Sequence, residues 1–125
     1  MRDSPTGRGE VLVLEARSAV LAPLVRALRR RGIEVERVDG LASLRAAFAR
    51  AGGHDALVIA PDVPLTLARE AIATLRAVDP RLVAVTFDGG DGAAVPESDL
   101  HLAGLHPAAP VACGAIVRAM LVQRI

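Results

Sequence analysis

The chain has 125 residues, enough for one domain around a single core, and 52% of them are hydrophobic. The formal net charge of +1 argues against nucleic acid or an anionic membrane as partner, and an aromatic content of 2% argues against base stacking. The single cysteine, Cys113, excludes an internal disulfide and fits a reducing cytoplasm, and no apolar run has the length of a transmembrane helix.

Residues 1–9 are polar and rich in glycine, so we expect a flexible N-terminal tail there, without a signal peptide, in front of one domain over residues 10–125. The predicted strands are short apolar runs, apart from one alternating run that is typical of a sheet edge. In chain order they are Val11–Leu14, the alternating Ile33–Val38, Ala56–Ile59, Leu82–Phe87 and Leu100–Ala103.

Stripes of apolar residues at helical spacing lie between these runs. The first predicted helix begins after Ser18 and ends before Gly32. The other three cover Leu41–Ala51, Thr66–Val78 and Val111–Val122. Alternating strands and helices predict a doubly wound α/β fold, with a parallel sheet covered by helices on both faces. Residues 88–99 hold three glycines and a proline, so the helix expected between the last two strands is shortened or missing.

Residues 55–64 read Asp-Ala-Leu-Val-Ile-Ala-Pro-Asp-Val-Pro. This segment resembles the third strand and following loop of receiver domains from bacterial two-component response regulators, which typically read Asp-Leu-Val-Leu-Leu-Asp-x-x-Met-Pro. The resemblance extends over residues 10–122. It implies a flavodoxin-like, five-stranded parallel sheet of order 2-1-3-4-5 in a cytoplasmic signalling protein.

The resemblance also indicates which positions correspond to the phosphorylation site of the family. The phosphoacceptor position is occupied by Ala60, and the two adjacent acidic positions that help to hold Mg²⁺ are occupied by Glu15 and Ala16. Thr86 matches the hydroxyl residue that grips the phosphoryl group, whereas His106 stands where the family has a lysine before a proline. Residues 100–105 lack the aromatic switch residue of the family.

These losses resemble those of pseudo-receivers, which keep the fold for protein contacts without phosphorylation. The resulting hypothesis is a non-enzymatic pseudo-receiver without metal or cofactor. Its partner would be a signalling protein, an output domain or a second copy of the chain in a homodimer.

Two other hypotheses stay open. Asp62, two residues beyond Ala60, is either a displaced phosphoacceptor or a loop residue that caps the next helix or faces solvent. Alternatively, the cleft at the carboxyl ends of the strands binds a small regulatory molecule, as open α/β sheets commonly do. Its lining would then come from Glu15, Arg17, Thr86 and His106.

The remaining polar clusters carry weaker signals. The acidic residues Asp88, Asp91, Glu97 and Asp99 lack the full spacing of a Ca²⁺ loop and predict a solvated loop. The three histidines, His54, His101 and His106, have no metal-ligand spacing and are expected to be structural or at the surface. We expect Cys113 to be a buried, inert thiol.

The run of basic residues at Arg26 and Arg29–Arg31 has two interpretations. It fits the favoured charge at a helix C-terminus, and a nucleic-acid contact is the second reading.

Overall fold

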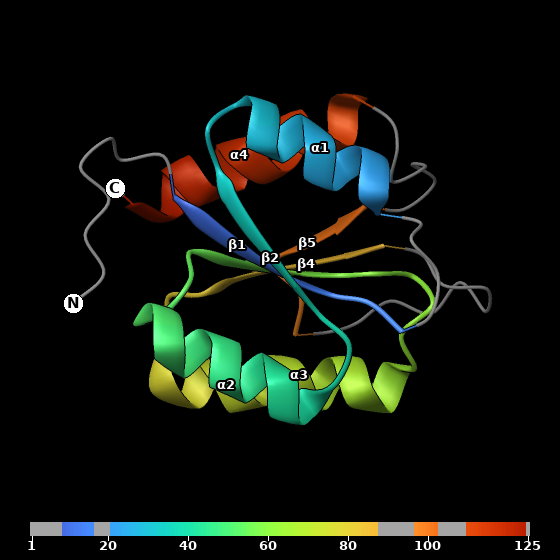
Figure 1. The fold of residues 1–125 in the computed structure, drawn as a ribbon, viewed down its shortest axis with the longest axis vertical. Coiled ribbons are helices and arrows are strands. Elements are labelled where there is room, and N and C mark those ends of the chain that lie inside the picture. The colour runs from blue at the N-terminus through green and yellow to red at the C-terminus, as the bar shows by residue number, and fades with distance from the viewer. Residues whose placement is uncertain (1–8, 17–20, 88–96, 103–109, 125) are drawn as a thin grey trace.

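A computed structural model describes residues 9–16, 21–87, 97–102 and 110–124, which form five strands and four helices (Figure 1). The elements in chain order are β1 (Glu10–Leu14), α1 (Ala22–Arg30), β2 (Glu34–Val38), α2 (Leu41–Ala51), β3 (Ala56–Ile59), α3 (Leu65–Val78), β4 (Val83–Phe87), β5 (Leu100–Leu102) and α4 (Pro110–Arg124).

The five strands form one sheet of order β2-β1-β3-β4-β5, and every neighbouring pair is parallel. This confirms the predicted fold class and strand order. Helices α1 and α4 pack on one face of the sheet and α2 and α3 on the other (Figure 1). The inner strands β3 and β4 are buried along their whole length, and in β1 only the first residue is partly exposed. Their continuous apolar runs follow from burial on both faces.

The helix boundaries differ from expectation at one end. Helix α1 begins at Ala22 with Leu21 as its N-cap and Pro23 in its first turn, whereas the sequence favoured a start after Ser18. Ser18 itself lies outside the described residues. The first turn of a helix tolerates proline because its N–H groups have no helical partner, so Pro23 was the better signal of where the helix begins.

Helix α2 ends as predicted, at two consecutive glycines. Gly52 has a φ of +74° and Gly53 a φ of +109°, a region that residues with a Cβ rarely adopt. Their N–H groups donate to the carbonyls of Ala49 and Phe48, which would otherwise lack a partner at the end of the helix.

The alternating strand β2 lies at the edge of the sheet, as its pattern predicted. Its N–H and C=O groups face β1 at Glu34 and Val38, so those of Val35 face outward. The guanidinium of Arg29, on α1, donates to the outward carbonyl of Val35 at 2.9 Å. This contact satisfies a backbone acceptor that an exposed edge would offer to another chain.

The link between β4 and β5 is only partly described. Residues 88–96 lie outside the described residues, as does most of the predicted tail, so the expected loss of a helix there stays a prediction. Just before β5, the backbone N–H of Asp99 donates to the carbonyl of Ala84 at 2.9 Å. The carboxylate of Asp99 accepts the N–H of Ala84 at 2.7 Å, so Asp99 continues the pairing of β4 beyond the ladder.

Candidate functional site

The carboxyl ends of β1, β3 and β4 bring three of the predicted site positions together. Leu14 pairs with Ile59, and Ile59 pairs with Thr86. Glu15 and Ala60 directly follow the first of these pairs, and the Ala60 N–H donates to the Leu14 carbonyl at 2.9 Å. Parallel strands end on the same side of a sheet, which is where open α/β folds place their ligands.

Ala60 directly follows β3 and is almost completely covered, at 2% exposure. A turn follows it, in which the N–H of Val63 donates to the Ala60 carbonyl at 3.2 Å. Asp62 is exposed within this turn. The residue at the centre of the edge therefore offers no nucleophilic oxygen, and the nearest carboxylate downstream belongs to a solvent-facing turn.

Glu15, by contrast, is buried and its carboxylate is held by Arg37 from the edge strand β2. Nε of Arg37 donates to Oε1 at 2.7 Å and a terminal guanidinium nitrogen donates to Oε2 at 3.1 Å. The Glu15 side chain is 11% exposed and the Arg37 side chain 38%. This two-point geometry is the strong form of an ion pair, because the planar guanidinium matches both oxygens at once.

The hydrogen bond to Glu15 raises the pKa of Arg37 above its already high value, so Arg37 stays charged. A fixed positive charge therefore sits on the carboxylate that would otherwise be available to a cation. The next residue, Ala16, is half-buried and adds no side-chain oxygen. Because Mg²⁺ requires several oxygen ligands in octahedral geometry, Glu15 and Ala16 provide a poor site for it.

The hydroxyl of Thr86 is also engaged within the protein. Thr86 is 2% exposed, and its Oγ1 lies 2.7 Å from Nδ1 of His101 in a hydrogen bond. The same hydroxyl donates to the Ser98 hydroxyl at 3.0 Å, and Ser98 in turn donates to the carbonyl of Leu100 at 2.8 Å. Thr86 is thus part of a chain of hydrogen bonds that joins β4 to the start of β5.

Sequence reasoning missed His101 as a member of this site. His101 is the direct cross-strand partner of Thr86 in the β4–β5 ladder, and its ring is partly buried. The ring stands on β5, the strand on which the aromatic switch residue was expected and not found. Its position between Leu100 and Leu102 was an available signal, because alternation in a short strand places it on the face opposite to those leucines.

Arg17, His106, Asp88 and Asp91 are outside the described residues. Among the described residues, His, Cys, Asp and Glu side chains form no group of three that could hold a metal ion. None of the described helices combines the length and the apolar character needed to cross a membrane.

His54 and Cys113 are both buried. His54 stacks on Phe48, with ring centroids 5.8 Å apart, and its Nε2 lies 3.7 Å from a carboxylate oxygen of Glu36. The thiol of Cys113 is buried in α4, as expected. Both residues belong to the packing of the domain. His54 comes just before β3, at the end of that strand opposite to the carboxyl edge that holds Glu15 and Thr86.

No protein-family model and no curated protein sequence matches this chain. Solved structures do match over nearly its whole length. The receiver domain of nitrogen regulatory protein C has 21% identity and a TM-score of 0.75, and the match covers 94% of this chain and 98% of that one. The signal receiver domain of an HD domain-containing protein from Pseudomonas fluorescens Pf-5 has 15% identity, a TM-score of 0.75 and coverage of 98% and 93%.

A third match is a CheY-like response regulator receiver domain from Methanospirillum hungatei JF-1. It has 14% identity and a TM-score of 0.73, with coverage of 92% of this chain and 95% of that chain. At these identities the likeness concerns the backbone arrangement. The strand order, the helical layers and these matches together establish that the chain has the fold of CheY-like receiver domains.

Proposed function

We propose that this chain is a pseudo-receiver: a regulatory module of bacterial signalling that takes up no phosphoryl group, has no enzymatic activity and acts by binding another protein. The observation that carries the proposal is Ala60, the residue that directly follows β3 at the edge that also holds Glu15. Phosphoryl uptake by a protein side chain requires a nucleophilic oxygen in line with the phosphorus atom. A methyl group supplies none.

The ion pair between Glu15 and Arg37 supports the same function. Phosphoryl transfer depends on positive charge that neutralises the phosphoryl oxygens, and in Mg²⁺-dependent sites carboxylates hold that charge. Here both Glu15 oxygens accept hydrogen bonds from one guanidinium. The negative charge of Glu15 is therefore neutralised by Arg37 of the same chain, without a cation.

The bonded state of Thr86 adds a third argument. A hydroxyl that grips a phosphoryl group must be able to turn toward it. The Thr86 hydroxyl is instead buried and bonded to His101 and Ser98. With its site residues bound to one another, the domain would bind its partner in a single conformation. We propose that this partner is a cytoplasmic signalling protein, an output domain or a second copy of the chain.

The experiment that tests this function is treatment of the purified protein with acetyl phosphate and Mg²⁺, followed by intact-mass spectrometry. A receiver domain with an intact phosphoacceptor aspartate serves as the positive control. We expect the control to gain a phosphoryl group and this chain to gain none. A stoichiometric adduct on this chain would overturn the proposal.

The two alternative functions give different outcomes. If an adduct forms and is lost in Asp62→Asn, the exposed Asp62 is a displaced phosphoacceptor. If the domain instead binds a small regulatory molecule, a screen of nucleotides and phosphorylated metabolites will raise the melting temperature by several degrees with one of them. The internal bonds of Glu15 and Thr86 favour the protein-binding function, because two of the four expected cleft residues are already occupied.

A further inference from the structure

The two helical layers differ in how their arginines are compensated. In the layer of α2 and α3, most arginines pair with carboxylates of neighbouring segments. These pairs are Arg50 with Glu36, Arg69 with Glu97 and Arg76 with Asp99. Arginines on this layer are therefore largely neutralised within the domain.

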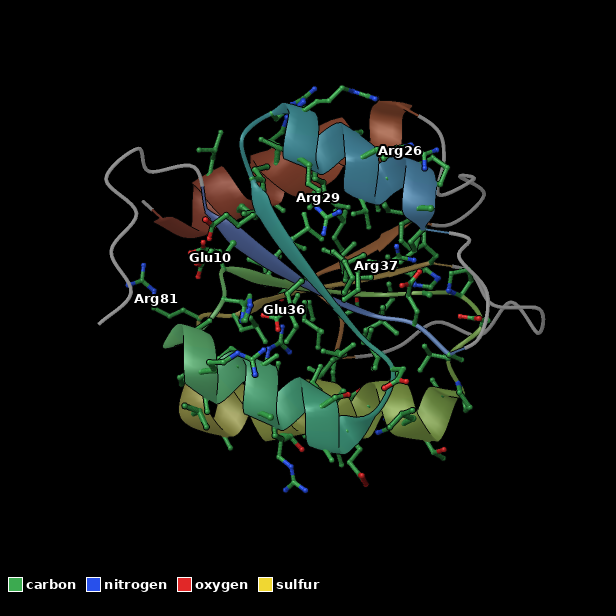
Figure 2. The ribbon with its side chains drawn as sticks, in the orientation of Figure 1. Glu10, Arg26, Arg29, Glu36, Arg37 and Arg81 are labelled. Atoms are coloured by element: carbon green, nitrogen blue, oxygen red, sulfur yellow. The ribbon has the colours of Figure 1, made fainter. Side chains whose placement is uncertain are left out.

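Among the described side chains, the arginines of α1 and Arg118 of α4 form no such pair. The sequences of both helices contain no aspartate or glutamate. Helix α1 carries Arg26, Arg29 and Arg30 and is followed by Arg31, and all four are exposed. Figure 2 labels Arg26 and Arg29 on this helix. We call these four residues the α1 arginine surface.

The described residues provide no ion pair for the α1 arginine surface. Arg29 donates to a backbone carbonyl, that of Val35. The acidic side chains of β2 point away from α1: Glu36 pairs with Arg50 of α2, and alternation along the strand puts Glu34 on the same side. Both acidic side chains of β2 thus face the opposite layer, and the Glu15 carboxylate is already bound by Arg37.

The helix dipole explains only part of this arrangement. Arg29 and Arg30 lie in the last turn of α1, where positive charge is favoured. Arg26 lies one turn earlier, four residues from Arg30 and on the same side of the helix, where like charges repel. A cluster that is unfavourable in the isolated domain becomes favourable when a negative partner covers it.

We propose that the α1 arginine surface docks an acidic segment of a partner protein, whose carboxylates pair with Arg26, Arg30 and Arg31. This inference rests on the proposed function as a protein-binding module and names the chemistry of the partner. Guanidinium groups bind carboxylates through two parallel hydrogen bonds, so a few arginines give both charge and orientation. Helix α4, which contacts α1, carries a further exposed arginine, Arg118.

The other polyanions fit less well. A nucleic acid gains affinity from many phosphate contacts, whereas this chain has a net charge of only +1 and both of its aromatic residues, Phe48 and Phe87, are buried. A membrane-surface helix needs exposed large apolar side chains beside its basic ones, and the described residues of α1 expose none. An acidic protein segment requires neither feature.

The test uses a fluorescently labelled Glu-rich peptide and the full chain, with fluorescence anisotropy as the readout. Arg30→Glu is compared with Arg45→Glu, which makes the same charge change at an exposed arginine on α2. Arg26→Glu, in mid-helix, repeats the test away from the helix C-terminus. We expect each α1 variant to weaken peptide binding about tenfold and Arg45→Glu to change it less than about twofold.

Three outcomes would overturn the inference: no binding of the peptide, an equal loss in Arg45→Glu, or tighter arginine-dependent binding of single-stranded DNA or anionic vesicles than of the peptide. Thermal melts confirm that the variants fold. The phosphodonor experiment is independent of this result. Phosphorylation of the wild type would refute the proposed function alone, and failure of peptide binding without phosphorylation would refute the docking surface alone.

Discussion

Thr86 and His101 are direct partners in the β4–β5 ladder, and their side chains meet in a hydrogen bond of 2.7 Å at the carboxyl edge of the sheet. The bond ties the shortest strand, β5, to the fully buried β4. The cross-strand partner of Thr86 on β3 is Ile59, and Ala60 directly follows it. In the proposed pseudo-receiver, the contact that holds the short strand in place would also keep the Thr86 hydroxyl from binding a phosphoryl group.

Removal of the ring should destabilise the domain. His101→Ala leaves the buried Thr86 hydroxyl with one partner fewer, and we expect a loss of about 1–2 kcal/mol in the free energy of unfolding, measured by urea denaturation. Thr86→Val should cost a similar amount. A double-mutant cycle isolates the pair, with an expected coupling of about 1 kcal/mol. Strictly additive effects would show that the two side chains stabilise the domain independently.

The ion pair of Glu15 and Arg37 gives a second prediction. Arg37→Ala leaves the buried carboxylate of Glu15 without the guanidinium that binds both its oxygens, so we expect a loss of about 1–3 kcal/mol. The matched control is Arg45→Ala, an exposed arginine on α2, which should change stability by less than about 0.5 kcal/mol. If Arg37→Ala and Arg45→Ala have the same free energy of unfolding, the ion pair of Glu15 and Arg37 does not stabilise the fold.

The contact between Arg69 and Glu97 predicts a pH effect. The hydrogen bond from Arg69 lowers the pKa of Glu97 below its ordinary 4.5. A carboxyl group whose pKa is lower in the folded state stabilises the fold above its unfolded pKa. That contribution is lost as the pH falls below 4.5 and through the folded value. NMR titration of Glu97 should therefore give a midpoint below 4.5.

Arg69→Gln should return the midpoint of Glu97 toward 4.5, whereas Arg45→Gln should leave it unchanged. The Arg69 side chain is 53% exposed and the Glu97 side chain 32%, so water screens the pair and the effect on global stability is expected to be small. A midpoint in the wild type at the ordinary value would mean that the contact does not persist in solution.

The fold could be predicted from the sequence because burial on both faces gives parallel strands continuous apolar runs, as in Ala56–Ile59. The resemblance of the sequence to receiver domains implied that Glu15 and Ala60 lie at one edge of the sheet. The partners of the site residues could not be predicted. Which side chain faces Glu15 depends on the register of β2 against β1, and the pairing of Thr86 with His101 depends on that of β5 against β4. Hydrophobic patterns define strands but specify register weakly where a strand is polar on both faces, as β2 is.

The last prediction concerns a variant that reverses two features behind the proposed function, the methyl group of Ala60 and the ion pair of Glu15 with Arg37. The triple variant Ala16→Asp, Arg37→Gln and Ala60→Asp places three carboxylates at the carboxyl edge, with Glu15 released from its guanidinium. Without a cation, their mutual repulsion should lower the melting temperature. Mg²⁺ should restore it, because oxygen-rich sites bind this ion, with a stabilisation of about 1.4 kcal/mol when Mg²⁺ is at ten times its Kd.

The wild type and the single variant Ala60→Asp are the comparisons. Ala60→Asp alone keeps the Arg37 guanidinium on Glu15, so we expect little Mg²⁺-dependent stabilisation in it and none in the wild type. Equal Mg²⁺ responses in the single and triple variants would show that Arg37 does not compete with a cation. A wild type that Mg²⁺ stabilises would show that the edge binds the ion despite Ala16 and Ala60, and that the ion pair is displaced by it.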